Sequence, residues 1–262
     1  MAFCISNNDS DKKPKISEFI RKVFLDSNCI YGSRKISKEL KSKYGMTVNR
    51  KKVADIMRKE GIHSKSNKKY KATTNSKHHL PVYENKLNRD FVSAKPNMKM
   101  VSDITYIRTD EGWLYAAIVK DLCLKKVVGY AFSSRIDTNL TVAALEMAVR
   151  RQKPQSDLIF HSDRGVQYAS CQYREALAKH NITQSMSKKG DPYDNAVAEN
   201  FFSCLKCELV HLKHYHTRAE AQADIFAYIE VYYNTVRPQK SLNWLSPLAF
   251  EHLLSIYAAK VA

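Results

Sequence analysis

The sequence predicts an α/β fold, a mixed sheet flanked by helices, preceded by a small all-α domain. Residues 1–99 carry 24 Lys and Arg against 9 Asp and Glu, and their apolar residues recur at helical spacing. Residues 100–262 carry 19 against 17 and open with three strand-like stretches, after which strands and helices alternate. The 262 residues suffice for a buried core, and the 44% hydrophobic content excludes general disorder.

Three short helices are predicted in the basic N-terminal part. The first covers residues 14–27, the second begins at a Ser33 cap and ends at Gly45, and the third begins at Thr47 or Asn49 and ends at Glu60. A tight turn before a basic third helix is typical of a helix-turn-helix, so residues 14–62 are predicted to form a helix-turn-helix-like DNA-binding domain.

The outward face of that third helix carries Arg50, Lys51 and Lys52, which we expect to contact DNA. Basic side chains displace condensed counterions from phosphates, so the net charge of +17 indicates a polyanionic partner. The alternatives are a solubilising surface and a plain helical bundle with a solvated basic face. Residues 63–95 are polar, basic or weakly patterned and are predicted to form a basic linker.

The remaining elements are predicted in residues 96–256. Strands are expected at 101–109, 113–119, 126–132, 157–160 and 182–186. Helices are expected at 138–150, 171–180, 195–209 and 218–234.

Several classes of protein are excluded. No apolar run approaches the ~18 residues that a membrane span needs, and the N-terminus lacks the apolar segment of a secretory signal. Six cysteines are too few for a disulfide scaffold, so a cytoplasmic protein with reduced thiols is expected. A glycine-rich phosphate loop is also missing, which argues against an ATP-driven enzyme.

Three carboxylates are candidate metal ligands. Asp103 lies in the first strand, Asp163 just past the fourth, and Glu199 one turn into a helix. Carboxylates gathered at the ends of neighbouring elements form the oxygen-rich site that Mg²⁺ prefers, and two such ions about 4 Å apart can support in-line attack at phosphorus. Taken singly, Asp103 could be a structural acid, Asp163 a turn former and Glu199 a surface residue.

Other acids are predicted to have ordinary roles. Asp194 is placed as the N-cap of the helix that carries Glu199, where Asn would serve equally well. Asp121, Asp157 and Asp191 are expected to be loop or strand-end acids.

Five motifs in the second part of the sequence, in their order along the chain, resemble the integrase catalytic core of bacterial insertion-sequence transposases. The likeness is to the second-frame products of a family with two overlapping reading frames. Those motifs are Ser102-Asp103-Ile104-Thr105-Tyr106-Ile107, Glu111-Gly112-Trp113-Leu114-Tyr115, His161-Ser162-Asp163-Arg164-Gly165-Val166-Gln167-Tyr168, Tyr193-Asp194-Asn195-Ala196 and Glu199-Asn200-Phe201-Phe202. Thirty-five residues separate Asp163 from Glu199, as in this family. Tyr31-Gly32-Ser33-Arg34 similarly resembles the family's helix-turn-helix-like module.

The resemblance implies a ribonuclease-H-like fold with an Asp103–Asp163–Glu199 metal triad that binds Mg²⁺ or Mn²⁺ as two ions. It implies cleavage of double-stranded DNA at the ends of an element, followed by joining of the freed 3′-hydroxyl to target DNA. Lys206, seven residues after Glu199, matches a basic position near the DNA. A homo-oligomer on DNA, the upstream-frame product as a partner and a place at the bacterial nucleoid are further expectations.

Two departures from the family pattern keep other functions open. Met100 stands where Trp is usual and Gln239 where His is common. The rivals are a catalytically decayed copy that acts as a DNA-binding or inhibitory protein, and a nuclease of the same fold that hydrolyses without joining.

A zinc site is the last possibility that the sequence raises. Cys204-x-x-Cys207 is followed by His211, His214 and His216. Because no second CxxC follows, and because both cysteines lie in a predicted helix, we do not assign zinc to these cysteines.

Overall fold

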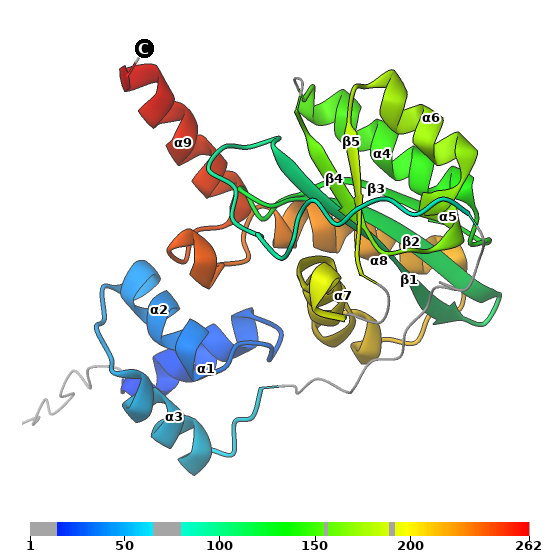
Figure 1. Ribbon diagram of the computed structural model, residues 1–262. Helices are drawn as coiled ribbons and strands as arrows, with labels where there is room; N and C mark the ends of the chain where they lie inside the picture. The colour runs from blue at the N-terminus through cyan, green and yellow to red at the C-terminus, as the bar shows by residue number, and fades with distance from the viewer. Residues whose placement is uncertain (1–14, 65–79, 155–156, 189–191, 262) are drawn as a thin grey trace, which may run out of the picture. The chain divides into compact units, whose positions relative to one another are not determined.

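The computed structural model describes residues 15–64, 80–154, 157–188 and 192–261 (Figure 1). The chain divides into two compact units, Met1–Ser66 and Asn67–Ala262. Each unit is described by itself.

The described part of the first unit consists of helices α1 (Ile16–Asp26), α2 (Ser33–Tyr44) and α3 (Arg50–Lys59). As predicted, Gly45 ends α2 in the left-handed conformation, with φ +64°. Asn49 caps α3 by accepting a hydrogen bond from the backbone N–H of Lys51 at 2.8 Å. The predicted Ser33 cap is wrong: Ser33 is the first helical residue, and Gly32 occupies the cap position without a side-chain bond.

The second unit is built on a five-stranded sheet of order β3-β2-β1-β4-β5. Its strands are β1 (Lys99–Thr109), β2 (Gly112–Asp121), β3 (Val127–Ser133), β4 (Ile159–Ser162) and β5 (Thr183–Met186). The first three form an antiparallel meander, whereas β4 runs parallel to both β1 and β5. The sheet is therefore mixed, as the sequence predicts.

Helices cover both faces of the sheet (Figure 1). The two faces follow from strand alternation, because Val101 and Ile107 of β1 join one apolar cluster whereas Met100 and Ile104 join the other. The first cluster includes α7 (Ala196–Glu208) and α8 (Arg218–Ala227); the second includes α4 (Thr138–Gln152), α5 (Val166–Ala169) and α6 (Cys171–Lys179).

Helix α4 packs closely on β3. A Cβ at Gly129 would lie 2.3 Å from the carbonyl oxygen of Ala144, so only glycine fits this contact. The single long helix predicted at 218–234 is two elements: α8 is followed by a π-helical turn, η3 (Tyr228–Tyr233). A final helix, α9 (Pro247–Val261), ends the chain, and no described helix is long and apolar enough to cross a membrane.

Part of the stretch predicted as a linker packs on the second unit. Residues 65–79 lie outside the described residues, but Leu87 is buried in the cluster with α7 and α8. The backbone N–H groups of Lys86 and Leu87 both donate to the Ser185 hydroxyl in β5. Residues 80–95 thus supply contacts beside the strands that carry the acidic residues.

Candidate active site

Strand pairing brings two of the predicted acids together at the carboxyl end of β4. In the parallel β1–β4 pair, Val101 lies opposite His161. Asp103 and Asp163 each follow these paired residues by two positions, and the charge of Asp163 acts on Asp103, as expected for neighbouring carboxylates. The Asp103 side chain is buried, with 7% of its surface exposed, and it accepts a hydrogen bond from the Ile104 N–H at 2.8 Å.

Asp163 lies one residue beyond β4, half-buried, at the start of a turn. One of its carboxylate oxygens accepts a hydrogen bond from the backbone N–H of Gly165, the residue that precedes α5, at 2.9 Å. Asp163 is therefore a turn former as well as a neighbour of Asp103.

Helix α7 supplies the third acid, because Glu199 lies in its first turn. The helix begins beside β1, where the Asn195 amide donates to the backbone carbonyl of Ser102 at 3.3 Å. This bond joins the residue before α7 to the residue before Asp103, so Asn195 positions the helix. The sequence reasoning gave Asn195 no role; only its place in the resembling motif singles it out.

The pKa values of the acidic residues and of Lys206 are shifted by burial and by one another's charges. Burial raises the pKa of Asp103 well above its usual value, and the charges of Asp163 and Glu199 raise it further. Burial and then Asp163 raise the pKa of Glu199. Burial lowers the pKa of Lys206 to about 8, against the opposing effect of Asp103, and the Lys206 ammonium lies 4.8 Å from the centre of the Tyr106 ring.

The donor set fits divalent cations. Mutual repulsion among the three carboxylates is what a cation relieves, and an all-oxygen set suits Mg²⁺ or Mn²⁺. Within the described residues, the three acids do not form a group whose ligand atoms all lie within 4.8 Å of one another.

The structure corrects the role predicted for Asp194. It is not the N-cap of α7: Asn195 holds that position, and Asp194 is 2% exposed within a 3₁₀ turn, η1 (Pro192–Asn195). Its carboxylate accepts from Asn85 Nδ2 at 2.8 Å, Arg89 Nε at 3.1 Å and the Lys188 N–H at 2.8 Å. Although burial raises the pKa of this carboxyl, the bonds from Lys188 and Arg89 outweigh it and hold the pKa below its usual value.

Asp121 and His161 also have structural roles. Asp121 is the last residue of β2, as predicted, and its fully buried carboxylate accepts from the Asn97 and Leu124 N–H groups at 2.7 Å each. His161 is buried in β4, and its Nδ1 lies 2.9 Å from the Ser185 hydroxyl. Burial lowers the pKa of His161 to about 4, so this side chain is neutral at pH 7.

The other predicted site residues belong to the first unit. Arg50, Lys51 and Lys52 are exposed in the first turn of α3, which contains no acidic residue. The structure therefore places the three acids and Lys206 on the second unit and the other predicted basic residues on the first.

The mixed sheet thus carries Asp103 within β1 and Asp163 directly after β4, and Glu199 lies in the first turn of α7. Two family models described as "Integrase core domain" match residues 93–192 and 180–247, and a model described as "HTH-like domain" matches residues 11–70. A simian T-cell lymphotropic virus intasome structure, solved in complex with a PP2A regulatory subunit, matches with a TM-score of 0.53 at 13% identity. The match covers 89% of this chain and 74% of that one, and it supports the ribonuclease-H-like fold alone.

Curated relatives are much more similar in sequence. Transposase InsF for insertion sequence IS3A of Escherichia coli is 42% identical over 230 residues, which cover 88% of this chain and 80% of the relative. The insertion element IS600 uncharacterized 31 kDa protein of Shigella sonnei is 40% identical over 241 residues, 92% of this chain and 88% of the relative. The chain belongs to this family of insertion-sequence transposases.

Proposed function

We propose that this protein catalyses metal-dependent DNA cleavage at the ends of an insertion element and joins the freed 3′-hydroxyl to target DNA. Asp103, Asp163 and Glu199 are the proposed metal ligands. The observation that carries the proposal is that the three acids converge. Asp103 lies in β1, Asp163 directly follows β4, which pairs with β1, and Glu199 lies on a helix whose start is hydrogen-bonded to β1.

The chemistry needs no protein nucleophile. Bound Mg²⁺ or Mn²⁺ would lower the pKa of the attacking water or 3′-hydroxyl and offset charge at the scissile phosphate. Asp103 and Glu199 have raised pKa values, so a bound cation would favour the ionised form of both carboxylates. With a pKa of about 8, Lys206 is mostly protonated at pH 7, and its ammonium can hold a phosphate oxygen beside Asp103.

The helical unit is proposed to bind the DNA duplex through α3. Cations in the first turn of a helix face the positive end of its dipole, which is unfavourable unless an anion is close. Arg50, Lys51 and Lys52 lie there without an acidic neighbour in that turn, which supports phosphate or base contacts. A homo-oligomer on DNA, a contribution from an upstream-frame product and a place of action at the bacterial nucleoid complete the proposal.

A strand-transfer assay on end-containing DNA tests this function. Asp103→Asn, Asp163→Asn and Glu199→Gln should each abolish cleavage and joining while leaving binding to end DNA intact. Asp157→Asn is a matched control because Asp157 is exposed and lies outside the three acids. Near-normal strand transfer in any one of the three variants would remove that residue from the site.

The same assay separates the two rival functions. A nuclease of this fold would give hydrolysis without joined product, and a decayed copy would bind end DNA without either reaction. Chelation with EDTA should stop both steps and Mg²⁺ should restore them.

A further inference from the structure

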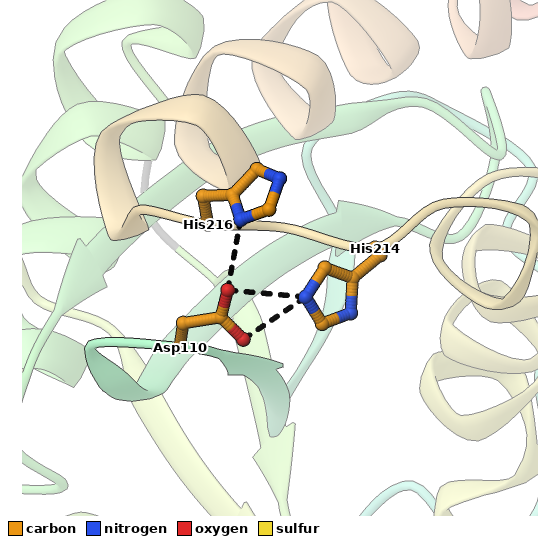
Figure 2. Close-up of side chains that lie close together, drawn as sticks. All are labelled: Asp110, His214 and His216. Carbon is orange, nitrogen blue, oxygen red and sulfur yellow. Dashed lines mark hydrogen bonds and ion pairs between the residues drawn. The ribbon is translucent and has the colours of Figure 1, made fainter.

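A second group of potential ligands lies on the surface of the second unit, formed by Asp110, His214 and His216 (Figure 2). His214 Nε2 lies 3.0 and 3.1 Å from the two oxygens of Asp110, and His216 Nδ1 lies 2.9 Å from one of them. Figure 2 shows both rings directed at the one carboxylate. Within the described residues, this is the group of three whose ligand atoms all lie within 4.8 Å of one another.

The local backbone explains why both rings reach Asp110. The backbone is extended at Lys213 and again at Thr217, so successive side chains in this segment point to opposite sides. Tyr215 points inward and is 2% exposed, whereas His214 and His216 on either side of it are exposed.

One backbone hydrogen bond and two bonds between backbone and side chain hold this segment against the turn that carries Asp110. The Asp110 N–H donates to the Tyr215 carbonyl at 3.1 Å. On the other side of the turn, the Arg218 N–H donates to the Glu111 carboxylate and Arg218 Nε donates to the Trp113 carbonyl. The three ligand-bearing residues are thus positioned by contacts that their own side chains do not make.

We propose that Asp110, His214 and His216 bind a transition-metal dication, with Zn²⁺ as the best fit. Two imidazoles and one carboxylate form a donor set that zinc accepts, with water free to complete the shell. The hydrogen bonds from His216 and His214 lower the pKa of Asp110, which keeps its carboxylate ionised. A bound ion would clamp the β1–β2 turn to the segment that leads into α8.

This site is separate from the acidic one. Asp110 follows Asp103 by seven residues along β1, which corresponds to about 23 Å of extended chain. The donor sets also differ: mixed nitrogen and oxygen ligands favour zinc, whereas three carboxylates favour Mg²⁺.

The cysteines of the zinc pattern considered from the sequence are engaged elsewhere. Cys204 Sγ lies 3.2 Å from Arg237 Nη2 and 4.0 Å from Asn200 Oδ1, within α7 and its neighbours. Neither Cys204 nor Cys207 belongs to a described group of three potential ligands. His214 and His216 therefore meet a partner 104 or more residues away in sequence instead of the nearby cysteines.

The test is a Zn²⁺ titration of the metal-stripped full chain in excess Mg²⁺, in competition with a chromophoric chelator. One tight equivalent per chain is expected. His214→Ala and His216→Ala should each lower the Zn²⁺ affinity by at least about tenfold. Even the loss of a residue that only supports a metal ligand lowers metal affinity by about that factor. His252→Ala, which removes an exposed histidine of α9, should leave the Zn²⁺ affinity unchanged. Unchanged affinity in both His214→Ala and His216→Ala would overturn the proposal.

Co²⁺ binding identifies the donor atoms independently of affinity. A spectrum without sulfur-to-cobalt charge transfer, lost in the double variant His214→Ala/His216→Ala, supports the proposed ligands. A charge-transfer band that survives in this variant would assign the metal to cysteines and overturn the proposal. Because all three side chains are exposed, the variants should fold, which circular dichroism checks.

Discussion

Substitutions of Asp194 distinguish between two roles for its carboxylate, an anchor for distant residues and an N-cap of α7. The Asp194→Ala variant removes the acceptor of three hydrogen bonds and leaves the Asn85 amide and the Lys188 N–H without their partner. A hydrogen bond to a charged group contributes about 1.5–3 kcal/mol net. The Arg89 side chain is 54% exposed, so its ion pair adds at most about 1 kcal/mol.

We therefore expect Asp194→Ala to lower the free energy of unfolding by about 3–5 kcal/mol. At roughly 2–4 °C per kcal/mol for a unit of this size, the Tm should fall by about 6–20 °C. Asp194→Asn keeps the shape and one acceptor oxygen, but its amide NH₂ faces a donor, so about 1–3 kcal/mol should be lost.

Calorimetric unfolding of the full chain at neutral pH measures both variants. An N-cap would give a different pattern, because Asn caps as well as Asp and Ala costs only about 1 kcal/mol. A neutral Asp194→Asn together with a mild Asp194→Ala would therefore refute the anchoring role.

The pH dependence of stability gives a second test of the role of Asp194. Since the pKa of Asp194 is held below its ordinary value of 3.8, its stabilising effect is present above that pH and is lost as the pH falls through the lowered value. Wild-type protein should therefore lose more stability than Asp194→Asn between pH 5 and the acid limit of folding. Parallel pH profiles would contradict this.

Three further changes test other parts of the molecule. Lys206→Gln should lower strand transfer by about 10–100-fold because one cationic contact near the reacting phosphate is lost, while Mg²⁺ binding measured by calorimetry should persist. Gly129→Val should destabilise the second unit by more than about 2 kcal/mol in a denaturant titration, since any Cβ meets the α4 backbone. Changing Arg50, Lys51 and Lys52 together to Ala should flatten the salt dependence of DNA binding by up to about three units of slope, whereas an unchanged slope would place phosphate contacts elsewhere.

Much of the fold could be predicted because its signals are local. The periodicity of apolar residues gave the strands and most helices, and Gly45 and Asn49 marked helix ends by their own backbone and side-chain chemistry. The π-helical turn after Ala227 was missed, because the apolar pattern simply continues through it.

The errors concern residues whose partners are distant in sequence. Asp194 has the local pattern of a cap, and the bonds that decide its role come from residues 105 and 109 positions earlier. The sequence gave His214 and His216 no partner, and the turn after β1 brings Asp110 to them. A single sequence contains no signal for such pairings.

These long-range bonds also explain how the acidic residues are held. Asn195 binds the β1 backbone beside Asp103, and Asp194 binds the 85–89 segment, whose backbone in turn donates to Ser185 of β5. Asp194 and Asn195 thus attach the start of α7, the helix that carries Glu199, to the 85–89 segment and to β1. Since the Glu199 side chain is only partly buried, its placement depends on this helix start more than on packing around the carboxylate. It follows that substitutions at Asp194 and Asn195 should impair strand transfer through the position of Glu199, even though neither side chain is proposed to bind metal.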